Sequence, residues 1–564
     1  MNYIQEKENW SKAAERSMRW LKNNWIFAGF FCAMAGYYLW RLYFIPPWYD
    51  ELYTYESFID KGVIYSMIHW PLPNNHVLYS ALSALLNKLG SPYLGLRGVS
   101  LLASMAGLGL FYRILKKVVR PHAAALGCAL FASMYNVTQQ AVQGRGYALS
   151  GFFLIAGINL LYEICVPERT GGGRRRFWLY AGFAACLTGG LYAIPSNLYW
   201  VVPICLAGGL FLLLFRDYGS LFRLIAASLF AALVTFGLYT VIWLAIGSNF
   251  LVKEAGGPFY GMSHFQMLLS DPFAAFSRGM QAMLSDPNIQ SVEREQFWAE
   301  FAGYLSRLMD QVYPSGSRFL PIVIILALTA AAALLIVSLR KREKGLSLLC
   351  LYCLVLTVMV PIFLIVQCVF PYLRVFTYMG SVLAMLFVLT MLAGAWLLQG
   401  ALGARRGRAK PAAAVGQKRS GMRTEGVQAL LCAALSAFLA IVLLSRPSYQ
   451  AGYDSRDNHI CAALKQLDID EVDTVMVGDV YARLNLYFHI ERCQGKQLVI
   501  DEEQPDYVLM DKIQTGTEGE ALIWPYDRNT QDFPWEWIEG HMEVVFEDDA
   551  YIAYQVKREE TQAE

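Results

Sequence analysis

Charged side chains are scarce in this chain of 564 residues. Asp, Glu, Lys and Arg make up 16% of it, whereas a soluble globular protein carries about 25%. The two signs nearly balance, with 47 basic and 45 acidic residues and a net charge of +2. This balance provides no bulk electrostatic attraction for nucleic acid, so we expect no nucleic-acid partner. Hydrophobic residues make up 56% of the chain, and they indicate its class.

Apolar runs close to the length that a helix needs to cross a hydrocarbon core of about 30 Å recur along most of the chain. The first run follows a polar segment, residues 1–24, and no small-residue cleavage site follows it. We therefore expect a retained helix and not a signal peptide. The fold class predicted is mainly α, a polytopic helical membrane protein with about eleven spanning helices in residues 25–445. These spans cover approximately residues 25–45, 98–115, 122–138, 147–165, 177–194, 198–215, 222–246, 318–338, 346–369, 375–398 and 427–445.

Lys and Arg residues gather in every second loop. The basic segments are residues 12–22, 113–120, 169–176, 216–223, 340–344 and 405–423, the last within a loop at 402–424. Because short cytoplasmic loops carry the excess of Lys and Arg, this alternation predicts a cytoplasmic N-terminus and an outer C-terminus. Loop 402–424 is expected to be disordered and cytoplasmic. The outside then holds residues 46–97, 139–146, 247–317, 370–374 and the tail.

The outer loop 46–97 is expected to form two surface helices. The first covers about residues 50–61 and ends at Gly62. The second covers residues 76–89, which are too few to span a membrane. The polar residues of this second helix share one stripe, with leucines opposite, as in a helix lying along a membrane surface; they are His76, Ser80, Ser83 and Asn87. In loop 247–317 two more helices are expected, at about 264–284 and 291–311.

The polar tail, residues 446–564, is long enough to form a small extracytoplasmic α/β domain. Strands are predicted at 475–477, 497–500, 507–510 and 544–556, and helices at 457–467 and 480–490. Cys461 and Cys493 are its only cysteines. An outer compartment permits a disulfide between them, and two free thiols are equally compatible with the sequence.

The candidate site residues lie at the outer membrane boundary. Asp50 and Glu51 follow the first span, and an acidic pair at membrane depth suggests function. Three arginines, Arg97, Arg145 and Arg374, also face outward, against the positive-inside trend. Such arginines favour a carboxylate or a phosphate as partner. The plainer alternatives are a helix start for the acidic pair and snorkelling anchors for the arginines.

Four motifs resemble the GT-C superfamily of integral-membrane glycosyltransferases, near the protein O-mannosyltransferases and the aminoarabinose transferases of lipid A. The motifs are Trp48-Tyr49-Asp50-Glu51, Pro73-Asn74-Asn75-His76, Leu96-Arg97-Gly98-Val99-Ser100 and Gln143-Gly144-Arg145-Gly146-Tyr147-Ala148-Leu149. The resemblance covers roughly residues 25–400. Arg97 is followed by Gly-Val where many relatives carry Leu-Pro.

The resemblance implies transfer of a sugar from a polyprenyl-phosphate donor to an envelope acceptor on the outer face, commonly with inversion. It assigns Asp50 as the base, with Glu51 positioning the acceptor or sharing that role. Arg145, Arg374 and Arg97 would contact the donor phosphate, and Asn75, His76 and Tyr147 would contact substrate. Structural roles for Asn75 and His76 at the start of their helix remain the alternative.

The resemblance also suggests a bacterial cytoplasmic membrane, with membrane lipids as partners. No metal site or cofactor is predicted, although His69 and His76 leave a divalent ion open. The alternative function is a transporter or a lipid or glycolipid flippase. Such proteins usually show inverted repeats and paired broken helices, and no convincing internal repeat is visible here.

Overall fold

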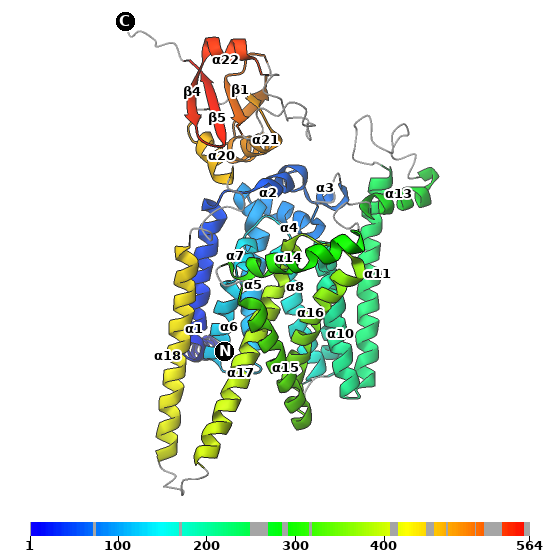
Figure 1. Ribbon diagram of the computed structural model, residues 1–564, viewed down its shortest axis with the longest axis vertical. Coiled ribbons are helices and arrows are strands. Elements are labelled where there is room, and N and C mark those ends of the chain that lie inside the picture. Colours follow the sequence, from blue (N-terminus) through cyan, green and yellow to red (C-terminus); the bar gives the residue numbers. More distant parts are fainter. Residues whose placement is uncertain are drawn as a thin grey trace.

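The computed structural model describes residues 2–70, 75–167, 172–248, 269–284, 291–314, 318–406, 416–446, 456–467, 469, 472–501, 503–512 and 533–557. A bundle of long helices carries short helices over one end, and a small α/β domain stands above these (Figure 1). The long elements of the bundle are α1 (Asn2–Phe44), α5 (Pro92–Leu115), α8 (Tyr147–Cys165), α9 (Gly173–Ala193), α10 (Leu198–Leu214), α11 (Tyr218–Ser248), α15 (Leu320–Lys341), α16 (Lys344–Gln367), α17 (Met379–Arg406) and α18 (Gly416–Ser445).

The protein is a helical membrane protein. Within the described residues, eight helices are long and apolar enough to cross a membrane, and they coincide with eight of the predicted spans. Predicted span 25–45 forms the second part of α1, and span 177–194 lies in α9. One span is wrong as a continuous helix, because 122–138 breaks into α6 (Pro121–Ala132) and α7 (Tyr135–Gln140). The Thr138 hydroxyl there donates to the Ala132 carbonyl, so a side chain replaces part of the helical ladder.

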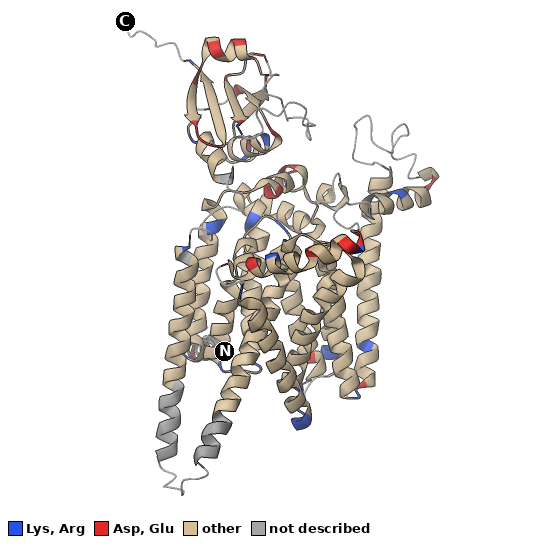
Figure 2. Cartoon of the chain, viewed as in Figure 1, with Lys and Arg blue, Asp and Glu red and all other residues tan. Residues whose placement is uncertain are grey.

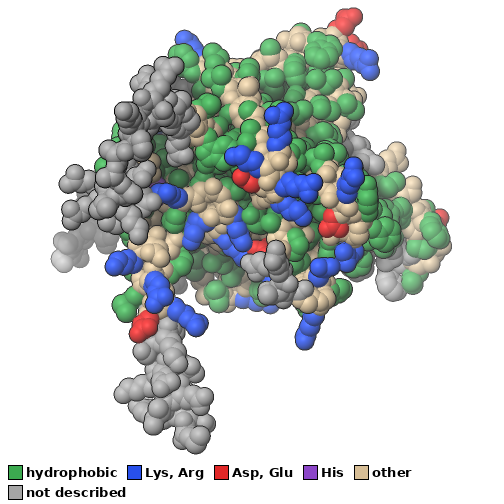
Figure 3. Space-filling model, turned by 90° about the horizontal axis from the view of Figure 1, so that it is seen from below, with side chains coloured by type: hydrophobic (Ala, Val, Ile, Leu, Met, Phe, Trp, Pro, Cys, Tyr) green, Lys and Arg blue, Asp and Glu red, His purple; other side chains and the backbone are tan. Residues whose placement is uncertain are grey.

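The two ends of the bundle differ in their content of charged residues. Lys and Arg residues occur at the helix ends remote from the C-terminal domain (Figure 2), and the space-filling view onto that end shows many basic side chains there (Figure 3). The alternation of basic loops in the sequence therefore corresponds to one basic face. The prediction of a disordered loop over 402–424 is wrong at both ends, because residues 402–406 lie in α17 and residues 416–424 lie in α18. Residues 407–415 lie outside the described residues.

Short helices cover the other end of the bundle. They are α2 (Tyr49–Thr54), the π-helical η1 (Tyr55–Ile59), α3 (Val63–Ile68), the 3₁₀ turn η2 (Pro195–Asn197), α4 (Val77–Asn87), α13 (Pro272–Leu284), α14 (Arg294–Val312) and the 3₁₀ turn η5 (Leu373–Tyr378). Gly62, with φ of 101°, ends the first surface helix as predicted. The polar stripe of α4 faces the protein, since Ser80 and Ser83 are buried while Leu82 and Leu85 are exposed. The first predicted helix of loop 247–317 begins only at Pro272, and residues 249–268 lie outside the described residues.

The tail forms a five-stranded sheet in the order β2-β1-β3-β5-β4. β1 pairs in parallel with β2 and β3, and β5 pairs antiparallel with β3 and β4. The predicted strand 544–556 is wrong as one strand, because it is a hairpin of two. The elements are α20 (Arg456–Leu464), β1 (Val472–Val477), α21 (Val480–Leu486), the π-helical η6 (Tyr487–Arg492), β2 (Gln497–Ile500), β3 (Tyr507–Asp511), α22 (Trp535–His541), β4 (Met542–Glu547) and β5 (Tyr551–Val556). No disulfide joins Cys461 to Cys493 in the structure.

Candidate functional site

Asp50 lies in the first turn of α2, just after the two prolines that end the first apolar run. Its carboxylate oxygen Oδ2 is 2.9 Å from Arg374 Nη2 and 3.8 Å from Arg145 Nη2. That oxygen is buried, while 13% of the side chain remains exposed. One side of Asp50 is thus held beside two cations, and another part of the same side chain remains accessible.

Glu51 has entirely different surroundings, although it is the next residue. Its Oε1 accepts hydrogen bonds from Arg97 Nε at 2.7 Å and from Gly144 N at 2.5 Å. Its Oε2 accepts from Arg97 Nη2 at 2.8 Å and from Trp48 N at 3.2 Å. Each carboxylate oxygen therefore has two donors, and Glu51 is only 2% exposed.

Arg97 is the partner of Glu51 and is also only 2% exposed. Its remaining N–H groups donate to carbonyls at the end of α1 and just beyond, those of Arg41, Leu42, Ile45 and Pro46. These carbonyls belong to the last turn of α1 and to the two residues beyond it, where few backbone donors are left; the Arg41 carbonyl also accepts from Ile45 N. Arg97 therefore caps α1 and holds Glu51, which places its guanidinium inside the protein.

Arg145, which lies beside Asp50, also contacts His76. Arg145 Nη1 donates to Thr54 Oγ1 at 2.8 Å, and Arg145 Nη2 is 3.3 Å from His76 Nε2. His76 Nδ1 accepts a hydrogen bond from the backbone N–H of Gly146 at 2.8 Å. Burial, with Arg145 and Arg374 adding to it, lowers the pKa of His76 well below its ordinary value. A neutral ring that accepts at Nδ1 carries its proton on Nε2, so Nε2 and Arg145 Nη2 are two neighbouring donors.

Arg374 is held from several sides at the start of η5. Its Nε donates to the hydroxyl of Tyr147 at 2.9 Å. Its guanidinium lies 5.1 Å from the ring centroid of Trp48 and 4.6 Å from that of Tyr372. Aromatic faces stabilise a cation while leaving its edge available to an anion. The part of Arg374 that meets Asp50 is therefore positioned by Tyr147 and two aromatic rings.

The two glycines around Arg145 are required by close approach. A Cβ on Gly144 would lie 2.5 Å from Leu96 Cδ1 and 3.1 Å from Glu51 Oε1. A Cβ on Gly146 would lie 3.1 Å from His76 Nδ1. The Gly-Arg-Gly element therefore lets the backbone reach Glu51 on one side of Arg145 and His76 on the other.

Asn75 connects the two surface helices and is 2% exposed. Its Nδ2 donates to the carbonyls of Ser66 and His69, at 2.8 and 3.0 Å, and its Oδ1 accepts from Ser80. These contacts fix the start of α4, where His76 stands. Sequence reasoning missed Arg41, which is buried and donates to Gln139 Oε1 at 2.8 Å; an Arg inside the first apolar run was the available signal.

The C-terminal domain packs on α2 and η1 from outside, with α20 and α21 on the side facing the bundle (Figure 1). The ring of Tyr55 meets that of Phe488 edge to face, with centroids 4.9 Å apart. Asp60 Oδ2 accepts from the Tyr487 hydroxyl and pairs with Arg492 Nη2, each at 2.6 Å. The segment that carries Asp50 is thus held between the bundle and the tail.

No group of three His, Cys, Asp or Glu side chains suited to a metal occurs within the described part of the chain. His69, the second histidine considered for an ion, has its pKa lowered by burial to about 4. The contacts around Asp50 bring together one accessible carboxylate, two arginines and a neutral histidine.

The fold of this chain is similar to that of solved integral-membrane glycosyltransferases, the class that its sequence motifs resemble. ArnT from Cupriavidus metallidurans bound to undecaprenyl phosphate matches with a TM-score of 0.52 at 12% identity, over 93% of this chain and 97% of that one. The archaeal oligosaccharyltransferase AglB from Archaeoglobus fulgidus, in complex with an inhibitory peptide and a dolichol-phosphate, matches with a TM-score of 0.43 at 13% identity, over 87% and 70%. At these identities the likeness shows the fold alone. No protein-family model and no curated protein sequence matches the chain.

Proposed function

We propose that this protein transfers a sugar from a polyprenyl-phosphate donor to a hydroxyl or amine acceptor at the outer face of the membrane, with inversion. The observation that carries the proposal is Asp50, an accessible carboxylate held beside Arg374 and Arg145 on a fold shared with a protein that binds undecaprenyl phosphate. A base must reach the proton of the attacking group. Cations must stand where the leaving group gains charge. In the proposal, the neighbouring side chains of Asp50, Arg374 and Arg145 would meet these two requirements.

In the proposed reaction, Asp50 takes the proton of the acceptor while the acceptor oxygen or nitrogen attacks the anomeric carbon. The bond from that carbon to the phosphate oxygen breaks, and its electron pair goes to the leaving phosphate. The donor is a phosphodiester and the product a phosphomonoester, so the leaving group gains one negative charge. Arg374 and Arg145 would stabilise this charge. Without donor, Oδ2 of Asp50 lies beside the same cations.

His76 would complete the phosphate site. Two N–H donors, on His76 Nε2 and Arg145 Nη2, lie 3.3 Å apart, and an anionic oxygen between them would accept from both. Tyr147 would position Arg374, and Asn75 would position His76 through the start of α4. In the proposal Glu51 and Arg97 hold α2 in place and contact neither substrate, because their polar atoms already bond to one another and to the backbone.

The donor lipid would enter beside Tyr147. A mostly apolar cavity there is bordered by α5, α8 and η5, and its lining includes Tyr38, Gly107, Phe152, Ile155 and Thr377 together with Tyr147. An isoprenoid unit would match such an apolar lining, and because the space is only about 40 Å³ it would have to widen to admit the chain.

The test uses purified protein in lipid bilayers with a panel of labelled polyprenyl-phosphate sugars and envelope extract, and measures release of free polyprenyl phosphate. Wild type and Glu300→Gln, an exposed carboxylate on α14, are expected to release it. Asp50→Asn is expected to fold and to lose at least about a hundredfold in rate, the usual effect of removing a general base. Equal release by Asp50→Asn would remove Asp50 as the base. Movement of intact donor between leaflets without release would favour the flippase.

A further inference from the structure

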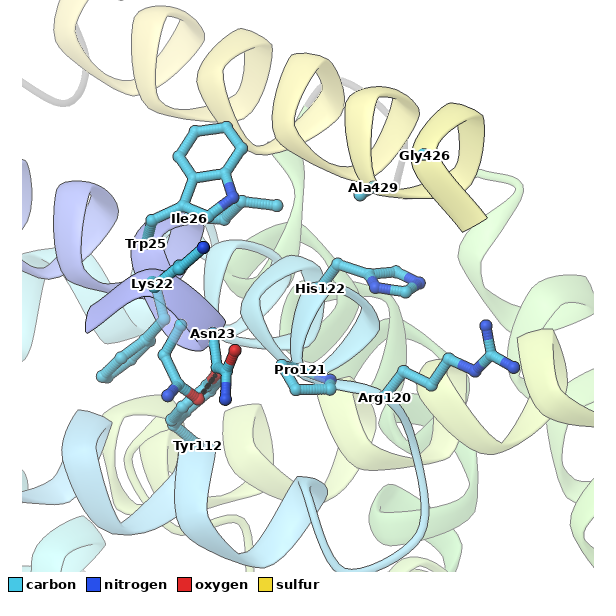
Figure 4. A pocket seen from close by; sticks show the side chains of 12 residues that line it. Lys22, Asn23, Trp25, Ile26, Tyr112, Arg120, Pro121, His122, Gly426 and Ala429 are labelled. Carbon is cyan, nitrogen blue, oxygen red and sulfur yellow. Dashed lines mark hydrogen bonds between the residues drawn. The ribbon is translucent and has the colours of Figure 1, made fainter. Parts of the chain in front are cut away.

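A cavity of about 660 Å³ lies at the basic end of the bundle, between α1, the start of α6 and α18 (Figure 4). Tyr112 of α5 borders it, fifteen residues beyond Arg97 on the same helix. At about 1.5 Å per residue, that places it about 22 Å from the site around Asp50. The cavity is therefore separate from the proposed active site, and nothing in the reaction uses it.

α1 breaks beside the cavity at Asn24, a lining residue whose φ of −127° is not helical. The Asn24 side chain donates from Nδ2 to the Trp20 carbonyl at 2.5 Å, which inserts a side chain into the helical ladder. Its Oδ1 accepts from the Tyr112 hydroxyl at 2.7 Å and from Lys116 Nζ at 2.9 Å. These bonds hold the bend open, and among the described side chains of the facing helix α18, Gly426 and Ala429 border the space.

The lining combines cations with an interfacial aromatic residue. Figure 4 shows Lys22 and Trp25 on one side of the space and Arg120 and His122 on the other. Among the described residues that line it, none is Asp or Glu. Trp25 is 56% exposed, and tryptophan is typical of the boundary between lipid and water.

Apolar surface continues from the cavity along α18. Val427, Leu430 and Leu431 are all more than half exposed there. A membrane-spanning helix presents such residues to acyl chains. A ligand that suits both features has an anionic head and hydrocarbon tails, whereas a free phosphate would use only the cations.

We propose that this cavity binds the phosphate headgroup of an anionic phospholipid from the leaflet at the basic face. Lys22 and Arg120 contact the phosphate, Trp25 lies at the level of the glycerol, and the acyl chains run along α18. The bound lipid fills the space between α1 and α18 that the break at Asn24 leaves open. This inference does not depend on the proposed sugar transfer, because it concerns the opposite end of the bundle.

The test is native mass spectrometry of purified protein given phosphatidylglycerol or phosphatidylcholine in a non-ionic detergent. Wild type is expected to retain phosphatidylglycerol preferentially. Lys22→Gln/Arg120→Gln is expected to bind it about 25-fold more weakly, at about fivefold for each basic side chain near an anionic lipid. The control Arg174→Gln/Arg340→Gln removes equal charge from α9 and α15, at positions that do not line the cavity, and it is expected to bind as wild type does.

A third variant separates shape from charge. Ala429→Leu narrows the cavity without changing charge, and weaker phosphatidylglycerol binding by a variant with wild-type thermal stability supports the site. Equal weakening in both double variants would show attraction to the whole basic face and would overturn the proposal. Displacement of the lipid by millimolar inorganic phosphate would reduce the site to one for free phosphate, and unchanged binding in the cavity variants would also refute it.

Discussion

Replacement of Glu51 by Gln is predicted to destabilise the protein far more than replacement of Asp50 by Asn. Each oxygen of Glu51 accepts one hydrogen bond from Arg97 and one from the backbone. An amide can offer only one oxygen, so whichever way the new side chain points, two buried donors lose their acceptor. At about 1–3 kcal/mol for each buried unsatisfied group, the loss is about 2–6 kcal/mol. This agrees with the roughly 3–5 kcal/mol typical of breaking a buried ion pair.

The assay is thermal unfolding in detergent, followed by intrinsic tryptophan fluorescence, for wild type and both variants. The unfolding temperature of Asp50→Asn should be close to that of wild type, because the Asp50 side chain is partly exposed. Loss of its charge also leaves Arg145 and Arg374 with their other partners, Thr54 and Tyr147. A double variant, Glu51→Gln/Arg97→Met, should be less destabilised than the sum of the single variants, since no buried charge is then left alone. A Glu51→Gln protein as stable as wild type would refute the structural role of Glu51. So would an Asp50→Asn protein that unfolds first.

Three further predictions concern the glycine element, the arginine at η5 and the tail. Gly146→Ala should slow polyprenyl-phosphate release with little change in expression, because its Cβ would lie 3.1 Å from His76 Nδ1 and the ring would have to shift by a few tenths of an ångström. Arg374→Lys should keep the charge but raise the KM for donor, because an ammonium cannot contact Asp50 and Tyr147 together as the guanidinium does; an unchanged KM would count against a phosphate role. Burial lowers the pKa of His489 to about 4, so the unfolded chain binds its proton at a higher pH than the folded chain. Stability should therefore fall as pH drops from about 6.5 toward 4, with a shallower fall in thermal scans of His489→Gln.

The sequence indicates the membrane class and most of the spans because hydrophobic length and the placement of Lys and Arg are local properties. It also places Asp50, Arg145 and Arg374 at one end of the bundle, since topology alone brings those loops to the same side. The break of predicted span 122–138 was less visible, because its polar residues are few and their effect on the backbone depends on local bonding. The tail hairpin was missed because residues 544–556 form one run in which only the acidic residues 547–549 mark the turn.

The roles within the site depend on contacts far apart in the chain. An outer arginine predicts a carboxylate or a phosphate as partner, and the sequence does not distinguish the two. In the structure Arg97 meets Glu51, 46 residues earlier, whereas Arg374 meets Asp50 across more than 300 residues. Only the three-dimensional structure shows that Asp50, and not Glu51, is the carboxylate that stays accessible, because it shows which arginine pairs with each.

The two adjacent carboxylates have different surroundings because successive residues of a helix point about 100° apart. Glu51 faces α5 and the loop before α8, where Arg97 and Gly144 hold it. Gly144 directly precedes Arg145, so the contact that fixes Glu51 also fixes the backbone next to the cation beside Asp50. Arg97 also caps the helix that leads into the acidic pair. The buried ion pair therefore fixes the backbone on both sides of the proposed site, so in the proposed reaction Glu51 would act by positioning and not by contact with substrate.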